Sequence, residues 1–187
     1  RRRSACWRAE NTCRGTTCRA YVSGRVPDEL PGRLIIMCRQ LFGRYLDMTH
    51  VGTKVIKTPR LTLRPFCMED REAMFRNWES DPKVTEFLRW PTAKSIADAQ
   101  RVLEGWTASY KDPSFYQWAI VLEELGEPIG SISVVEQDEA TDKVHIGYCI
   151  GSRWWHKGIT SEAFSAIIPF LFEEVGANRI ESQHDPN

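Results

Sequence analysis

Residues 154–163 (WWHKGITSEA) carry the residue types best suited to chemistry in this chain. They follow an apolar, strand-like run at residues 144–151 and open a long helical pattern. A strand, a loop and a helix in this order leave the first N–H groups of the helix without backbone partners. Such groups, together with the positive end of the helix dipole, bind anions. We therefore interpret the stretch as a phosphate-binding loop, to which four side chains offer further donors: His156, Lys157, Thr160 and Ser161.

The elements that must position this loop follow from hydrophobic periodicity. Alternating patterns predict strands at residues 60–66, 115–123, 128–135, 143–150 and 179–183, and helical spacing predicts helices at 70–78, 95–110 and 159–175. Consecutive strands with short turns predict antiparallel pairing, and the final strand–helix–strand predicts a right-handed parallel crossover. The expected fold is a mixed α/β sheet with a crevice at the carboxyl ends of the crossover strands.

Four residues carry more local predictions. Ser95 and Asp98 have the spacing of a capping box at the start of the second helix. Gly147, inside a strand pattern, indicates a bulge or an ordinary buried glycine. Pro169 lies inside the crossover helix, so we expect a kink or a shortened helix there.

Charge is distributed unevenly along the chain of 187 residues, although its formal net charge is zero. Residues 1–50 hold ten Arg, no Lys and four acidic residues, whereas the rest is acidic. An arm that binds nucleic acid or a membrane surface is one interpretation. We favour a poorly ordered or non-native extension at 1–47, followed by one domain at 48–187. No apolar run approaches the roughly 18–20 residues of a membrane span.

Six cysteines occur without the spacing of a metal site. They lack a Cys-x-x-Cys pair, and Cys67 and Cys149 lie in core-like runs, which disfavours a disulfide framework. We expect free thiols, a reducing cytoplasmic location and no metal.

The ordered set of segments resembles the GNAT superfamily of N-acetyltransferases, in particular the branch that acetylates N-terminal amines of ribosomal proteins. The resemblance covers about two thirds of the chain and implies a GNAT-like mixed, mostly antiparallel sheet with a splayed strand at 143–150 and a domain incomplete at its C-terminus. The matching segments are 58–65 (TPRLTLRP), 129–132 (IGSI), 146–150 (IGYCI), 155–163 (WHKGITSEA), 179–181 (RIE) and Asn187.

The resemblance implies acetyl-coenzyme A as cofactor, with its pyrophosphate in the loop. Trp155 stands at the family's Arg/Gln position, His156 where the branch often has Gly, and Thr160 where Gly or Ala is usual. Only Gly158 keeps the glycine pattern. The implied cofactor-binding residues are Tyr148, Cys149, Ile150, Trp155, His156, Lys157, Gly158, Ile159, Thr160, Ser161 and Asn187.

Acetyl transfer to an amine requires the amine to lose a proton. His145 stands where many relatives have Glu and is our candidate base, although a strand histidine that faces away from the cleft explains it equally well. Glu136 and Asp138 are rival bases. The family's general acid lies beyond Asn187. Phe87 and Trp90 are the candidate acceptor-site residues.

The sequence therefore predicts an N-acetyltransferase that moves an acetyl group directly from acetyl-coenzyme A to a primary amine, either a protein N-terminus or a small molecule. A coenzyme A thioester-binding module without turnover is the main alternative. A nucleic-acid binder that uses the Arg-rich arm is a weaker one. A homodimer remains open.

Overall fold

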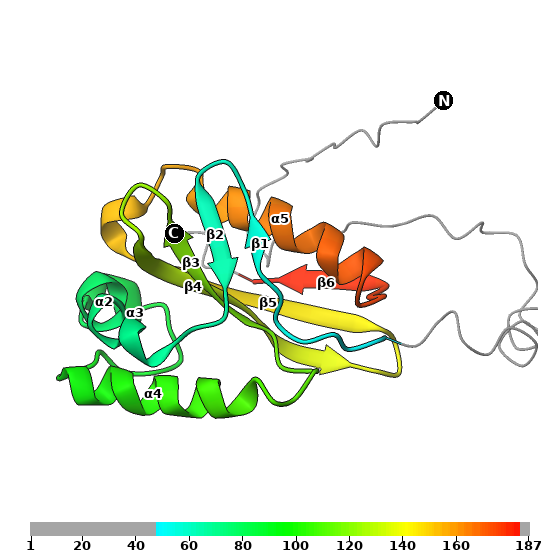
Figure 1. Cartoon of the computed structure of the whole chain (residues 1–187), viewed down its shortest axis with the longest axis horizontal. Helices are drawn as coiled ribbons and strands as arrows, with labels where there is room; N and C mark the ends of the chain where they lie inside the picture. Colours follow the sequence, from blue (N-terminus) through cyan, green and yellow to red (C-terminus); the bar gives the residue numbers. More distant parts are fainter. Residues whose placement is uncertain (1–47, 184–187) are drawn as a thin grey trace, which may run out of the picture.

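A computed structural model describes residues 48–183, which form one six-stranded sheet (Figure 1). The strands lie in chain order, and every neighbouring pair is antiparallel except β5 and β6. This topology confirms the predicted fold class. The strands are β1 (Ile56–Lys57), β2 (Leu61–Arg64), β3 (Gln117–Leu122), β4 (Glu127–Asp138), β5 (Lys143–Ile150) and β6 (Arg179–Ser182).

Helices cover both faces of the sheet, with α5 on one face and α2, α3 and α4 on the other (Figure 1). Side chains alternate between the faces. Along β5, Ile146 and Ile150 pack in the cluster that includes α5, whereas Cys149 packs in the cluster under α4. The helices are η1 (Met68–Asp70), α2 (Arg71–Met74), the π-helix η2 (Phe75–Glu79), α3 (Pro82–Thr85), α4 (Ile96–Ser109), η3 (Ser152–Trp154) and α5 (Ile159–Glu173).

The termini of the two long helices agree with the sequence. Ser95 and Asp98 form the predicted capping box of α4. Gly176 has φ 80°, and the Ala177 N–H bonds back to the Leu171 carbonyl at 2.9 Å, which ends the helical course of the chain after α5. Pro169 lies inside α5, which continues to Glu173, so this proline does not end the helix.

Gly147 marks a bulge, as one of the two interpretations predicts, but the extra residue lies on the opposite strand. Gly147 pairs in register with Ser133, and the extra residue is Val135 on β4. A Cβ atom at position 147 would lie 2.6 Å from Val135 Cγ1. Glycine is therefore needed here to make room for the bulged valine.

The parallel pairing of β5 with β6 covers only the first half of β5. It ends at Ile146 and Ser182, where the Ser182 hydroxyl donates to the Ile146 carbonyl at 2.9 Å. Within the described range, Gly147–Ile150 pair with β4 alone. Among residues 48–183, the second half of β5 therefore has one open edge, on its β6 side.

Candidate active site

The loop before α5 has the backbone geometry of an anion site. Gly158, the N-cap, has φ 71°, and its carbonyl accepts the Glu162 N–H at 3.1 Å. The N–H groups of Ile159, Thr160 and Ser161 therefore precede the first intrahelical bond. His156, Lys157 and Gly158 are exposed, so this end of the helix is open to a ligand.

His156 takes the place of a glycine in conformation as well as in sequence. Its φ is 59°, in the left-handed region that costs a residue with a Cβ atom about 1–2 kcal/mol. Thr160, the other departure from the family pattern, lies in the first turn of α5, where any side chain is allowed. The permissive backbone is therefore needed at His156 and Gly158, not at Thr160.

The turn between β1 and β2 braces the loop, a role that the sequence pattern did not reveal. Thr58 Oγ1 and Arg60 Nε donate to the two carboxylate oxygens of Glu162, each at 2.6 Å. Arg60 Nη1 also donates to the Lys157 carbonyl at 3.1 Å. Burial alone would raise the pKa of Glu162, but these hydrogen bonds lower it. The guanidinium of Arg60 thus lies beside the loop, where it is paired with the carboxylate of Glu162.

The open edge of β5 presents backbone polar groups. The Gly151 N–H bonds to the Ile129 carbonyl, which identifies the hydrogen-bonded pairs of the β4–β5 ladder. Because hydrogen-bonded and non-hydrogen-bonded pairs alternate, the backbone groups of Tyr148 and Ile150 point away from β4. Trp155 Nε1 satisfies the Ile150 carbonyl at 2.9 Å. The N–H and C=O of Tyr148 and the N–H of Ile150 face the open edge.

The side chains on this half of β5 are packed away from that edge. The Tyr148 ring meets Phe164 of α5 edge-on, with ring centroids 5.2 Å apart, and Ile150 is buried. The Cys149 thiol lies 3.3 Å from the Ser131 hydroxyl on the opposite face. Burial raises the pKa of Cys149 to about 11, so this cysteine is a neutral thiol near pH 7.

The candidate bases lie farther along the sheet. His145 pairs with Glu136 across the β4–β5 ladder and lies in register with Glu181 on β6. No hydrogen-bond partner for the His145 ring lies within residues 48–183. His145 lies four residue steps before Cys149 along the strand, or roughly 13 Å away. The structure therefore brings His145 and Glu136 together, nearer the β4–β5 turn than the loop.

Asp138 has a structural role in the turn that follows β4. Its carboxylate accepts the Thr141 hydroxyl at 2.7 Å and the Ala140 N–H at 3.0 Å. The hydrogen bond from Thr141 and that from the Ala140 backbone lower the pKa of Asp138. These contacts occupy both carboxylate oxygens and disfavour Asp138 as a base.

Phe87 and Trp90 lie on the connection between α3 and α4, where they are 56% and 39% exposed. The Trp90 indole N–H donates to Glu79 Oε2 at 3.2 Å. Glu79 is 2% exposed and is the last residue of the π-helix η2. A continuous helix was predicted here, and that pattern gave no sign that Glu79 would be buried.

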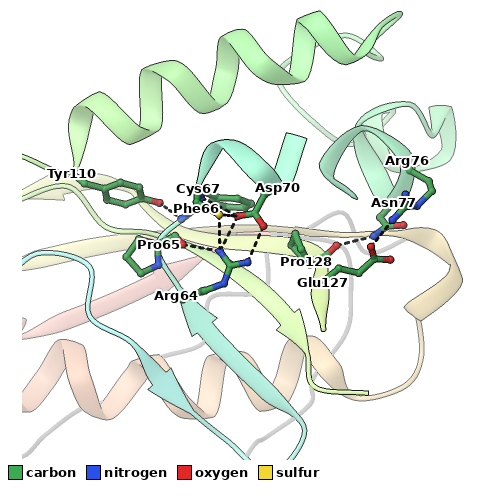
Figure 2. Close-up of polar contacts among 10 residues, drawn as sticks. All are labelled: Arg64, Pro65, Phe66, Cys67, Asp70, Arg76, Asn77, Tyr110, Glu127 and Pro128. Carbon is green, nitrogen blue, oxygen red and sulfur yellow. Dashed lines mark hydrogen bonds and ion pairs between the residues drawn. The ribbon is translucent and has the colours of Figure 1, made fainter. Parts of the chain in front are cut away.

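Hydrogen bonds fix η2 over the carboxyl end of β5. Figure 2 shows the Arg64 guanidinium paired with both carboxylate oxygens of Asp70 at 2.8 Å, below the start of this helical segment. In the same view, Asn77 Nδ2 donates to the Pro128 carbonyl at 2.8 Å. A Cβ atom at Gly151 would lie 2.2 Å from the Asn77 carbonyl oxygen. The close approach of η2 to β5 therefore requires a glycine at position 151.

Some predicted features lie outside the described residues. These are Asn187, the Arg-rich segment at 1–47 and its four cysteines. Within residues 48–183, no group of three or more His, Cys, Asp or Glu side chains could hold a metal ion. No helix in that range is both long and apolar enough to cross a membrane.

Comparison with known proteins agrees with this geometry. An N-acetyltransferase of Bacillus licheniformis called p20, itself uncharacterised, is 29% identical over 133 residues, which are 71% of this chain and 74% of that protein. A structure assigned to a ribosomal-protein-serine acetyltransferase of Vibrio cholerae superposes with a TM-score of 0.64 at 22% identity, covering 72% of this chain and 75% of the other.

A second solved structure is the microcin C7 self-immunity acetyltransferase MccE, in complex with acetyl-CoA and AMP. Its TM-score is 0.56 at 19% identity, with 70% of this chain and 71% of the other covered. At these identities the solved structures show the fold, and they include the ribosomal-protein branch that the sequence resembles. The model of the acetyltransferase (GNAT) domain matches residues 60–187. The chain therefore belongs to the GNAT acetyltransferase family and is an acyltransferase.

Proposed function

We propose that the protein transfers an acetyl group from acetyl-coenzyme A directly to a primary amine. The main support for this proposal is that an open strand edge leads directly into an anion site. The free backbone groups of Tyr148 and Ile150 lie on the strand that leads into the loop at His156–Ser161. One extended ligand with an amide-containing arm and a pyrophosphate would satisfy both.

The described residues offer groups for two parts of that cofactor, the pyrophosphate and the pantetheine arm. The N–H groups of Ile159, Thr160 and Ser161 would donate to the pyrophosphate, and Lys157 would add charge beside it. The edge of β5 would pair with the pantetheine arm. When bound, the cofactor supplies an activated acetyl thioester, and the protein has to orient it and exclude water.

Direct transfer fits the state of the two cysteines within the described range. A cysteine acts as a nucleophile through its thiolate. Burial raises the pKa of Cys149 to about 11, and burial also raises the pKa of Cys67. Neither thiol is activated for an acyl-enzyme route. The proton of the amine would instead pass to a base, for which His145 and Glu136 remain the candidates.

The acceptor class, the cytoplasmic location and the domain division are parts of the same proposal. We retain a primary amine, on a protein N-terminus or on a small molecule, as the acceptor. We also retain residues 48–187 as the catalytic domain. A chain that lacks residues 1–47 is expected to bind coenzyme A as the full chain does, and lost binding would contradict that division.

The test is release of free coenzyme A thiol on mixing the full chain with acetyl-coenzyme A and a panel of primary amines and short peptides. We expect thiol release that depends on both the amine and the protein. Binding of acetyl-coenzyme A without thiol release for any amine would favour a binding module without turnover. A dissociation constant of about 1 mM corresponds to a binding free energy of only about 4 kcal/mol. Absence of binding at that concentration would contradict both the transferase and the binding module.

A further inference from the structure

The carboxyl group of Glu79 is buried without a counter-charge. Oε2 accepts the Trp90 indole N–H, whereas Oε1 is buried and has no hydrogen-bond partner within residues 48–183. Burial raises the pKa of Glu79, and the indole N–H groups of Trp90 and Trp78 oppose that shift. No basic side chain in the described range contributes to it.

The adjoining residue and the form of this segment also bear on the site. The buried Trp78 indole N–H lies near the Glu79 carboxyl group without reaching full hydrogen-bonding geometry, so it does not supply the missing partner of Oε1. The segment is a π-helix, a form that is rare and frequent at functional sites. A buried carboxylate that lacks a cation is unfavourable unless a ligand supplies one.

Glu79 lies close to the part of β5 that carries the open edge. Its charge contributes to the raised pKa of Cys149, which is flanked by the two residues whose backbone groups face that edge. The Ser152 hydroxyl, just after β5, donates to the Asp81 carboxylate at 2.5 Å, two residues beyond Glu79. The carboxylate is therefore near the acetyl donor if the donor binds as proposed above.

The connection between α3 and α4 passes beside Glu79. The Ala93 N–H donates to the Glu79 carbonyl at 2.9 Å, and the Trp90 indole N–H donates to the Glu79 carboxylate at 3.2 Å. Trp90 is 39% exposed, so its indole lies between solvent and the buried carboxylate. An aromatic ring next to a carboxylate suits an organic cation, because the ring faces attract positive charge.

We propose that Glu79 binds the ammonium group of the acceptor amine, and that the Trp90 indole covers the carboxylate until the amine takes over its hydrogen bond. This inference rests on the proposed amine acetyl transfer and narrows the acceptor to amines that are cationic near neutral pH. An ammonium beside Glu79 lowers the pKa of that carboxyl group, so binding of the amine releases a proton.

The test is calorimetry of the full chain loaded with coenzyme A, titrated with alanine amide near about pH 6, where this amine is cationic. Titration in two buffers of different ionisation enthalpy that are not primary amines, cacodylate and MES, gives the number of protons released. We expect proton release in the wild type, none in Glu79→Gln, and an affinity at least about tenfold lower in that variant. Glu79→Asp should restore part of both signals.

Two controls separate a binding role from a structural one. Glu72→Gln removes an exposed carboxylate from α2 and should leave both signals unchanged. Aniline, a neutral amine at this pH, should bind the wild type and Glu79→Gln equally. Equal affinity and equal proton release for alanine amide in the wild type and in Glu79→Gln would overturn the inference, as would failure of alanine amide to bind at all.

Failure of the inference can be told apart from failure of the proposed function. If the wild type and Glu79→Gln release coenzyme A thiol equally with alanine amide, the acetyl transfer stands and the role of Glu79 is wrong. If alanine amide binds with Glu79-dependent proton release but no thiol is released, the amine site stands and the transfer reaction is wrong.

Discussion

The two sides of this site are built from different parts of the chain. The loop at His156–Ser161 uses backbone N–H groups and two left-handed residues, and its side chains are mostly exposed. The segment from η2 to α4 uses a buried carboxylate, buried hydrogen bonds and aromatic rings. The first side therefore depends on backbone conformation, whereas the second depends on the identity of particular side chains.

The largest expected effect comes from Asp70→Asn, which removes the ion pair with Arg64 beneath the second side. Asp70 is 5% exposed and holds Arg64 through two hydrogen bonds, so the loss should reach about 3 kcal/mol of unfolding free energy. Urea denaturation measures it. The folded variant should bind coenzyme A with unchanged affinity. A weaker affinity, measured where the variant is fully folded, would contradict the separation of the two sides.

The same variant has a defined pH dependence. Burial would raise the pKa of Asp70, but the hydrogen bond from Arg64 and the Cys67 N–H outweigh burial and lower it. A lowered pKa in the folded state means stabilisation that is complete above the unfolded pKa and is lost as the pH falls through the folded one. The stability difference between wild type and Asp70→Asn should therefore shrink below about pH 4.

Gly158→Ala changes the loop of the first side, and Gly126→Ala is its matched control. Both glycines have φ near 70°, and neither has an atom closer than 3.8 Å to an added Cβ. Each variant should lose about 1–2 kcal/mol of unfolding free energy from the left-handed backbone. Only Gly158→Ala should also weaken coenzyme A binding in calorimetry, because Gly126 lies in the turn between β3 and β4. Equal coenzyme A affinities would show that the loop is not the anion site.

The sequence predicted the first side well and the second poorly, for physical reasons. Alternation along β5 and the helical spacing after the loop are local signals, and the strand and the start of the helix lie where they are predicted. The helix predicted at 70–78 is present as one continuous helical stretch, but its type changes from η1 to α2 to the π-helix η2, where Asn77 bonds to the distant Pro128. Local propensity does not report such contacts.

Some of the missed features did leave a signal. Asp81 caps α3 and Pro82 occupies its first position, a pattern that a sequence can reveal. Gly147 also indicated a bulge, but the space left by its missing side chain is filled by Val135 on the neighbouring strand. The brace from Arg60 and Thr58 to Glu162 spans more than a hundred residues and could be found only in the fold.

The smallest expected effect concerns the backbone strain at position 156 in the first side. His156→Gly relieves the left-handed strain at φ 59° but adds freedom to the unfolded chain, so stability should rise by at most about 1 kcal/mol. His156→Val, with a branched Cβ, should instead lose stability. Urea denaturation of both variants measures the difference, and a destabilised His156→Gly would show that the imidazole has a structural role.

The central claim is that the start of α5 binds the pyrophosphate of coenzyme A. Calorimetric titration of the full chain with coenzyme A and with pantetheine, which lacks the pyrophosphate, tests it most directly. Because each charge-assisted hydrogen bond contributes about 1.5–3 kcal/mol, pantetheine should bind at least about tenfold more weakly. Equal binding of the two compounds, or no binding of coenzyme A, would contradict the account.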